Sequence, residues 1–140
     1  MKKWFGSSGV CINEVGQLLM VLQGRPGEKQ MWSIPSGGKE GSETFEECCI
    51  REIEEETGYR AKIVEEIKVK RVQYEGLNIE AEVHYFLALI VGGRMNIQDP
   101  DCLIYEIDWK SVDEIRTLEL TFPEDREYLI QYLSNPPTSF

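Results

Sequence analysis

The sequence lacks any lysine- or arginine-rich stretch: 15 basic residues face 25 acidic ones, and the formal net charge of the 140-residue chain is -10. A protein that binds long DNA or RNA needs clustered cations, because such a polymer is bound mainly through its phosphates. We therefore expect no nucleic-acid polymer as a partner. A small phosphorylated ligand is compatible with this charge, since a divalent cation can bridge acidic groups on the protein and on the ligand.

Long hydrophobic runs are missing as well. The longest apolar stretch, residues 83–91, is interrupted by His84 and is far shorter than the roughly 20 residues that cross a bilayer. The N-terminal Met1-Lys2-Lys3-Trp4 leads into Gly and Ser rather than into the apolar segment of a signal peptide. These absences predict no membrane partner and a cytoplasmic location.

Cysteine is scarce, and its spacing does not suit a zinc site. None of the four cysteines forms a C-x-x-C pair, and adjacent Cys48 and Cys49 are a poor start for a tetrahedral site. We expect reduced thiols, with Cys48 and Cys49 packed as small buried hydrophobic residues. The four are Cys11, Cys48, Cys49 and Cys102.

The remaining composition is that of a globular domain of common size. Hydrophobic residues make up 41% of the chain and charged residues 29%, and 140 residues suffice for a sizeable core. Neither an internal repeat nor a linker divides the chain, so we expect one domain over residues 1–140. The last residues, 134–140, include Pro136-Pro137 and are expected to be flexible.

Apolar runs separated by turn residues predict a chain of mixed α and β structure. Strands before and after one central helix, followed by a terminal helix, predict an α/β fold with a mixed sheet between helices. The first two strands are expected to pair as a hairpin across Glu14-Val15-Gly16. The expected strands are residues 4–13, 17–23, 31–34, 59–74, 79–91 and 103–109, and the expected helices are 43–57, 111–116 and 122–133.

The central helix has recognisable ends. Gly37 and Gly38 precede it and allow the backbone to approach another group closely, because glycine has no Cβ. Ser42 with Glu43 can cap the N-terminus and place negative charge there. The segment that follows contains neither Gly nor Pro, and Gly58 stands where a left-handed residue ends a helix.

One face of this helix is apolar, and its C-terminal end is acidic. At about 100° per residue, one row of apolar side chains should face the core. This row consists of Phe45, Cys49 and Ile53. Beside it, Glu52, Glu55 and Glu56 crowd one patch, where they repel one another and the partial negative charge of the helix C-terminus. A divalent cation would remove these penalties, so the pattern predicts a metal site close to Arg51.

The spacing of these residues resembles the signature of the Nudix hydrolases, the MutT-like enzymes. Gly37 is followed after five residues by Glu43, and after seven more by Arg51-Glu52-Ile53-x-Glu55-Glu56-x-Gly58, so that every polar and glycine position is matched. Tyr59 stands where a bulky aliphatic residue is usual, and Ser36 where glycine is commoner. The resemblance, which covers residues 37–59 most closely, implies a Nudix-type α/β/α sandwich and hydrolysis of a diphosphate bond.

The resemblance also implies a role for each residue. Glu55 and Glu56 are implied as direct ligands of Mg²⁺, or of Mn²⁺ in its place, together with the backbone carbonyl of Gly37. Glu52 matches either a ligand or the base that activates water. Arg51 matches the catalytic-site residue that orients the carboxylates. Structural support is expected from Glu43, Gly38 and Gly58.

Residues outside this signature leave open questions. A further acidic ligand from a distant loop often assists in this family, and the candidates are Glu82, Asp99, Asp101 and Glu106. Arg25 is well placed to meet a phosphate, and Trp32 or Tyr74 to stack on a nucleobase. Most other aromatic residues, Trp4 included, are expected in the core, and His84 is expected to be a packed strand residue.

We therefore predict a Mg²⁺-dependent hydrolase that cleaves a diphosphate bond in a nucleoside diphosphate-linked small molecule. A (deoxy)nucleoside triphosphate is the first candidate, and a dinucleoside polyphosphate or nucleotide sugar is the second. The alternative is a non-catalytic module of the same fold that binds a phosphorylated ligand as a sensor or regulator. Either a monomer or a homodimer is compatible with the sequence.

Overall fold

The computed structural model describes residues 1–97 and 103–135, and the statements below concern these residues. Within them, four strands precede the longest helix, three strands follow it, and two shorter helices come last. The strands are β1 (Lys2–Val10), β2 (Leu18–Gln23), β3 (Met31–Ser33), β4 (Ser36–Gly38), β5 (Tyr59–Tyr74), β6 (Ile79–Gly93) and β7 (Ile104–Lys110). The helices are α1 (Phe45–Thr57), α2 (Val112–Ile115) and α3 (Arg126–Ser134), with short 3₁₀ turns at Glu75–Leu77 and Pro123–Asp125.

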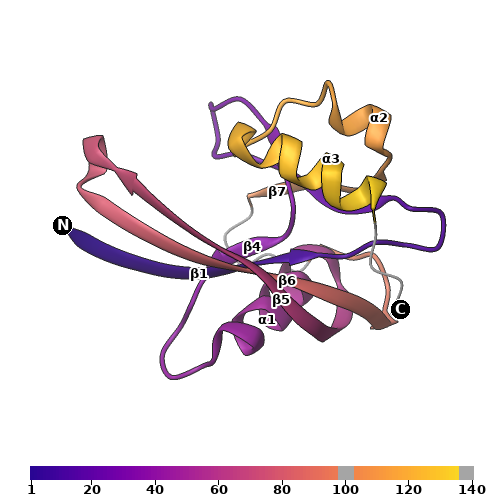
Figure 1. Cartoon of the computed structure of the whole chain (residues 1–140), viewed down its shortest axis with the longest axis horizontal. Helices are drawn as coiled ribbons and strands as arrows, with labels where there is room; N and C mark the ends of the chain where they lie inside the picture. Colours follow the sequence, from indigo (N-terminus) through magenta and orange to yellow (C-terminus); the bar gives the residue numbers. More distant parts are fainter. Residues whose placement is uncertain (98–102, 136–140) are drawn as a thin grey trace.

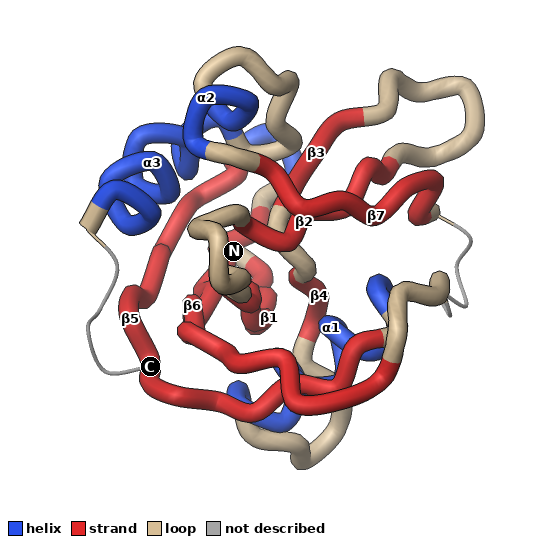
Figure 2. The backbone as a smooth tube through the Cα atoms, turned by 90° about the vertical axis from the view of Figure 1, so that its right-hand side faces the viewer, coloured by secondary structure: helices blue, strands red, loops and turns tan. Residues whose placement is uncertain are grey.

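Two sheets form the centre of the molecule, with helices on both sides (Figures 1 and 2). The first has the order β4-β1-β6-β5, in which β1 runs parallel to β6 and the other neighbours are antiparallel. The second has the order β3-β2-β7 and is antiparallel. Helix α1 packs on the first sheet, and α2 and α3 lie on the opposite side of the molecule. The predicted α/β/α architecture with a mixed sheet is confirmed.

The predicted hairpin forms only at the turn between the first two strands, where the N–H groups of Asn13 and Leu19 donate to the carbonyls of Gln17 and Cys11, each at 3.0 Å. β1 and β2 belong to different sheets, and the turn between them is closed by an isolated bridge between Ile12 and Leu18. β1 pairs instead with β6, in a parallel register that runs from Lys2–Ile79 to Val10–Leu87. Residues 6–10 of β1 are buried throughout, which is typical of a strand with partners on both edges and layers on both faces.

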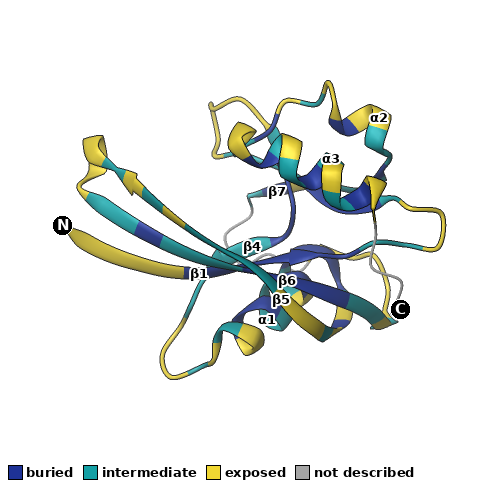
Figure 3. Cartoon of the chain, in the orientation of Figure 1, coloured by how far each residue is buried: buried dark blue, intermediate teal, exposed yellow. Residues whose placement is uncertain are grey.

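β1, β5 and β6 form an arm that extends past the rest of the molecule, to the left in Figure 1. β5 and β6 are 16 and 15 residues long, and the first residues of β1 pair beside the arm's tip. Much of the arm is exposed (Figure 3), and the exposed fractions of Trp4, Phe5 and Leu77 are 41%, 42% and 71%. The expectation that Trp4 lies in the core is therefore wrong, because the buried part of β1 begins only at Gly6.

Apolar clusters fill both sides of the first sheet, one against α3 and the other against α1. Cys48 and Cys49 of α1 are buried, as predicted, and are free thiols. Burial raises the pKa of the Cys11 thiol to about 12, so this group is protonated at neutral pH. Cys102 lies outside the described residues.

Helix α3 ends at Ser134, and Asn135 is the last residue that the structure describes. Residues 136–140 of the predicted flexible tail lie outside the described residues, and the single-domain organisation stays a prediction. In the part of the chain that the structure describes, no helix combines the length and apolar character needed to cross a membrane.

Candidate functional site

Helix α1 is capped by residues other than those predicted. Thr44, not Ser42, is the N-cap: its side chain accepts the backbone N–H of Glu47, and the Glu47 carboxylate accepts the backbone N–H of Thr44. This reciprocal capping box satisfies two backbone donors and determines where the helix begins. Glu43 consequently lies before the helix, where its carboxylate meets Arg51.

The helix ends at Gly58, as predicted, and this position requires glycine. Its φ is +82°, and a Cβ there would run into the backbone of Arg94 and Asn96. The N–H of Asn96 also donates to the carbonyl of Thr57 at 2.8 Å. These contacts fasten the acidic end of α1 to the chain that follows β6.

The glycine pair of β4 lies between a carboxylate and an indole ring. A Cβ on Gly37 would collide with the Glu52 carboxylate, and one on Gly38 would lie 3.3 Å from the Trp4 ring. The two glycines are therefore needed for two different close approaches. The Gly37 carbonyl faces α1, where the Cys48 thiol donates to it at 3.6 Å.

Arg51 gathers the acidic side chains of the site. Its guanidinium donates to Glu43 at 2.7 and 3.1 Å, to Glu52 at 2.8 Å and to Glu55 at 3.2 Å. It also donates to the Gly38 carbonyl at 2.9 Å, which ties α1 to β4. The hydrogen bonds from Arg51 lower the pKa of Glu43 to about 2, and the same bonds raise the pKa of Arg51.

Glu52 and Glu56 are the more buried members of the acidic patch. The Glu52 side chain is 13% exposed; burial raises its pKa, against hydrogen bonds with Glu56 and Arg51 that lower it. Glu56 is buried, and its Oε1 accepts the backbone N–H of Ser36 at 3.3 Å. The side chain of Glu55 is 34% exposed. Two poorly solvated carboxylates thus lie beside a third that is partly exposed, an arrangement that favours a cation among them.

These acidic side chains line a hollow of about 450 Å³, which we call the carboxylate cleft. It lies between α1, β4 and the start of β7, and its described walls hold four carboxylates but a single lysine, Lys39. The lining residues are Gln23, Ser36, Gly37, Gly38, Lys39, Glu40, Glu52, Glu55, Glu56, Leu103 and Ile104. The structure therefore brings every predicted metal ligand to one cleft.

The donors at this cleft suit a hard divalent cation. Carboxylate and carbonyl oxygens are the ligands that Mg²⁺ and Mn²⁺ prefer. Within the described residues, however, no three His, Cys, Asp or Glu side chains already converge as a ligand set, because Glu52 and Glu55 face Arg51. The chemistry of the donors fits the metal, and each of these two carboxylates has a second oxygen beside the one that accepts from Arg51.

Two of the predicted substrate-binding residues, Arg25 and Tyr74, line a second hollow of about 630 Å³. We call it the aromatic cavity after its four aromatic lining residues, Trp4, Tyr74, Tyr85 and Phe122. Sequence reasoning missed Trp4 and Phe122 as site residues. They come from opposite ends of the chain, and no local pattern marks them as neighbours.

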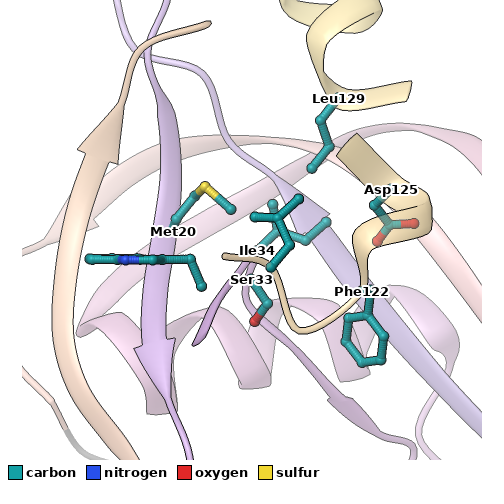
Figure 4. Close-up of a pocket in the computed structure, with 8 residues that line it drawn as sticks. Met20, Ser33, Ile34, Phe122, Asp125 and Leu129 are labelled. Carbon is teal, nitrogen blue, oxygen red and sulfur yellow. The ribbon is translucent and has the colours of Figure 1, made fainter. Parts of the chain in front are cut away.

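Trp32, by contrast, is a core residue. It is buried, and Lys110 Nζ lies 4.2 Å from its ring centre. It borders a cavity of only about 10 Å³, shown in Figure 4 with Ile34 and Phe122 among its lining residues. Such a space holds about one water at most, so the predicted stacking of Trp32 on a nucleobase is corrected to packing in the core.

The described candidates for an additional acidic ligand do not line the carboxylate cleft. Glu82 pairs with Arg71 and His84, and Glu106 is exposed on β7. Glu40, from the loop before α1, does line it. The remaining candidates, Asp99 and Asp101, lie outside the described residues.

His84 is packed, as predicted. Its ring stacks on Phe45 with 3.7 Å between ring centres, and its two nitrogens contact Glu66 and Glu82. Among the described lining residues of the carboxylate cleft and the aromatic cavity, His84 does not occur. It therefore joins β6 to α1 rather than serving either hollow.

Comparisons with known proteins agree with this geometry. The model of the NUDIX domain matches residues 5–133. An ADP-ribose pyrophosphatase of Bacillus subtilis is 33% identical over 130 residues, covering 89% of this chain and 69% of that protein. An 8-oxo-(d)GTP phosphatase of Mycolicibacterium smegmatis is 30% identical over 105 residues, covering 75% of this chain and 31% of that protein.

The fold also matches a solved structure. A NUDIX hydrolase from Nitrosomonas europaea superposes with a TM-score of 0.82 at 21% identity, covering 93% of this chain and 87% of that one. At this identity the likeness concerns the fold alone. In three further curated relatives, the chain spans only 38%, 55% and 26% of their lengths.

Proposed function

Because the chain belongs to the NUDIX family, we propose that it is a hydrolase that cleaves a diphosphate bond in a small nucleoside diphosphate-linked substrate, with Mg²⁺ or Mn²⁺ as cofactor. The observation that carries this proposal is the acidic cluster around Arg51, which lies directly against the glycine pair of β4. A cleft of about 450 Å³ offers space for a diphosphate beside these groups.

In this proposal, Glu52, Glu55, Glu56 and the Gly37 carbonyl hold the cation. A divalent cation in such a site neutralises charge on the phosphates and makes a bound water more acidic. Arg51 positions Glu52 and Glu55 relative to β4 through the hydrogen bonds described above. Lys39, on the cleft wall, supplies a positive charge for phosphate oxygens.

The reaction itself needs one water and one proton acceptor. The water oxygen forms a new bond to phosphorus while the bond from that phosphorus to the bridging oxygen breaks. Glu52 accepts the proton of the attacking water, or acts as a further ligand while solvent accepts it. Its contact with the Gly37 backbone and its hydrogen bond from Arg51 keep it in place for either role.

The substrate class follows from the names of two relatives, an ADP-ribose pyrophosphatase and an 8-oxo-(d)GTP phosphatase. We propose a (deoxy)nucleoside triphosphate first, and a dinucleoside polyphosphate or nucleotide sugar second. We further propose that the protein acts in the cytoplasm as a monomer or homodimer, with neither a nucleic-acid polymer nor a membrane as partner. The formal net charge of -10 supports the exclusion of the polymer.

The test is release of phosphate or nucleoside monophosphate from a panel of diphosphates in the presence of Mg²⁺. Glu55→Gln and Glu56→Gln are expected to lower the rate about 100-fold or more, because each removes charge from the metal site. Glu54→Gln is the matched control, since Glu54 is exposed on the same helix and does not line the cleft. Chelation of the metal should abolish release by the wild type.

The outcome also decides between an enzyme and a binding module. Equal and negligible release by the wild type and both variants would overturn the hydrolase. Binding of a nucleotide without turnover would then identify a NUDIX-fold sensor.

A further inference from the structure

Strands β1 and β4 bring two serine side chains next to each other. Ser8 lies opposite Ser36 in the antiparallel register of these strands. The adjacent pair is hydrogen-bonded, because the N–H of Gly9 donates to the Pro35 carbonyl at 2.9 Å, so the pair of serines is a non-hydrogen-bonded one. Side chains approach each other most closely at such positions. We call Ser8 and Ser36 the serine pair.

The serine pair lies on the face of the sheet that is turned away from α1. Side chains alternate between the two faces along a strand. In β1, the neighbouring Ser7 hydroxyl donates to the carbonyl of Phe45 in α1 at 2.7 Å. In β4, a Cβ on the neighbouring Gly37 would collide with Glu52 of α1. Both members of the serine pair therefore point to the opposite face, and both line the aromatic cavity.

Within residues 1–97 and 103–135, neither hydroxyl of the serine pair has a hydrogen-bond partner. Ser8 is only 4% exposed, so its hydroxyl is largely withdrawn from solvent. A hydroxyl in such a place is costly unless a ligand or a water supplies the missing partner. A ligand with hydroxyl groups of its own suits both serines, since a hydroxyl donates and accepts.

Ser36 connects the serine pair to the carboxylate cleft. Its backbone N–H donates to Glu56 Oε1 at 3.3 Å, and Ser36 lines both hollows. A diphosphate held beside Glu56 therefore places the next atoms of the substrate close to the serine pair. In a nucleotide these atoms are the 5′ carbon and the pentose, so the sugar is the first group that reaches the two hydroxyls.

The charges around the serine pair favour a neutral group over a further phosphate. Lys70, the one lysine in the described lining of the cavity, pairs with Glu124 at 3.3 Å and with Asp125 at 3.2 Å. The other cation of this lining, Arg25, is accompanied there by the acidic Glu28. A phosphate needs an excess of positive charge, whereas a sugar diol needs hydrogen-bond partners alone.

We propose that the serine pair binds the 2′- and 3′-hydroxyl groups of the substrate's pentose and thereby selects ribonucleotides over 2′-deoxyribonucleotides. The proposal rests on the proposed function, because the diphosphate in the carboxylate cleft determines where the pentose lies. Each serine hydroxyl can donate to one sugar hydroxyl or accept from it. A deoxy sugar leaves one serine without its partner, and a site built for a hydroxyl discriminates against the analogue that lacks it.

The test compares matched ribose and 2′-deoxyribose probes by isothermal titration calorimetry, with the intact chain and Mg²⁺. The probes are methylene-bridged nucleoside 5′-diphosphates of adenine, guanine, cytosine and uracil, whose P–C–P link resists hydrolysis. For at least one base, the ribose form is expected to bind about tenfold more tightly than the deoxy form, because a hydrogen bond to a buried hydroxyl is lost. Equal affinities in every matched pair, or binding by none of the probes, would overturn the proposal.

Variants then locate the preference. Ser8→Ala and Ser36→Ala should each reduce it to about twofold or less, because each removes one hydroxyl, whereas Ser36→Thr keeps a hydroxyl and should keep the preference. Ser7→Ala is the matched control, since the Ser7 hydroxyl donates to the Phe45 carbonyl on the other face of the sheet. Circular dichroism confirms folding. An undiminished preference for ribose in both alanine variants would show the proposal to be wrong.

Hydrolysis of the diphosphate panel separates this proposal from the proposed function. Ribose preference in binding without hydrolysis of any diphosphate leaves the serine pair assigned and removes the hydrolase. Hydrolysis at equal rates for ribonucleotides and deoxyribonucleotides, with equal affinities of the matched probes, removes the role of the serine pair alone. If the alanine variants weaken ribose and deoxyribose probes to the same extent, the pair contacts a phosphate and the sugar assignment fails.

Discussion

The carboxylate cleft and the aromatic cavity share Ser36 of β4 as a lining residue, yet the chain builds them in different ways. Most acidic groups of the cleft come from successive turns of α1 and meet the glycine pair that precedes it. The walls of the cavity come from β1, β5, β6, the loop after β2 and the segment before α3. The carboxylate cleft is thus built mostly from residues close together in the sequence, whereas the aromatic cavity depends on segments far apart in it.

The two regions also differ in how their polar groups are satisfied. At the cleft, Arg51 donates to three carboxylates and a backbone carbonyl, but the carboxylates still outnumber the cations among the described residues. At the aromatic cavity, the lining residue Lys70 pairs with Asp125 at 3.2 Å, and its neighbours in the lining include Val72, Ala81 and Val83. Acidic side chains therefore dominate the lining of the cleft, whereas apolar and aromatic side chains make up most of the described lining of the cavity.

The largest expected effect follows from removing Arg51, whose guanidinium binds the acidic side chains at the cleft. Arg51→Leu leaves Glu43, Glu52 and Glu55 without their shared donor, and we expect a loss of about 3 kcal/mol in the free energy of unfolding. Arg51→Lys should lose less but still impair activity, because an ammonium cannot reproduce the planar fork of donors. Urea denaturation measures the free energy of unfolding of both variants, and release of phosphate or nucleoside monophosphate measures their activity.

Arg116→Leu serves as the control for this comparison. Arg116 pairs with Asp113 at 2.7 Å, but both side chains are mostly exposed, at 57% and 87%. Exposed pairs of this kind contribute about 0–1 kcal/mol. Equal losses in Arg51→Leu and Arg116→Leu would contradict the central role of Arg51.

An intermediate loss of stability is expected from changing Tyr85, a lining residue of the aromatic cavity. The buried Tyr85 hydroxyl donates to Asp125 Oδ2 at 2.7 Å, and burial raises the pKa of this phenol. Tyr85→Phe deprives a buried carboxylate of a donor, so we expect a loss of about 1.5–3 kcal/mol in the free energy of unfolding. Thermal denaturation measures this loss of stability. The control is Tyr105→Phe, at a tyrosine that is exposed. A fall in metal affinity, rather than in stability, would contradict the separation of the two regions.

The smallest expected effect is a pH-dependent contribution of Glu43 to the free energy of unfolding. The pKa of Glu43 is lowered from 4.5 to about 2 by its hydrogen bonds with Arg51. The Glu43 carboxylate therefore binds a proton more readily in the unfolded chain than in the folded one. The stabilisation that ionised Glu43 gives the folded chain is present above pH 4.5 and is lost as the pH falls toward 2. Glu43→Gln should lower the free energy of unfolding by about 1–2 kcal/mol at neutral pH.

The pH profile of that difference is the decisive measurement. The wild type and Glu43→Gln should converge in stability as the solution is acidified, when unfolding by urea is followed at a series of pH values. Glu46→Gln is the control, since Glu46 is an exposed carboxylate in the first turn of α1, three residues after Glu43. A difference that stays constant down to pH 2 would show that Glu43 contributes through something other than its charge.

Several features of the fold were predictable because they depend on neighbours in sequence. The apolar row of Phe45, Cys49 and Ile53 packs on the sheet, and Gly58 ends the helix in the left-handed conformation. The cap was misplaced by two residues, since both Ser42 and Thr44 have suitable side chains. Only the reciprocal bond with Glu47 selects Thr44.

Other features were not predictable from local pattern. A hairpin between the first two strands is the nearest pairing, yet it forms only at the turn, and β1 lies between β4 and β6. Trp32 and Trp4 both looked like aromatic core residues, with Trp32 also a stacking candidate. The fold buries Trp32 under Lys110 and leaves Trp4 on the arm beside the cavity.

The sequence by itself determined the helix with its acidic end, the glycines around it and the arginine that faces the acids, because contacts at i, i+3 and i+4 follow directly from helical geometry. Only the tertiary structure decided which strands neighbour β1 and which aromatic rings share a cavity. Strand partners are chosen by burial over long sequence separations, and the same alternating pattern fits several pairings until the whole core is packed.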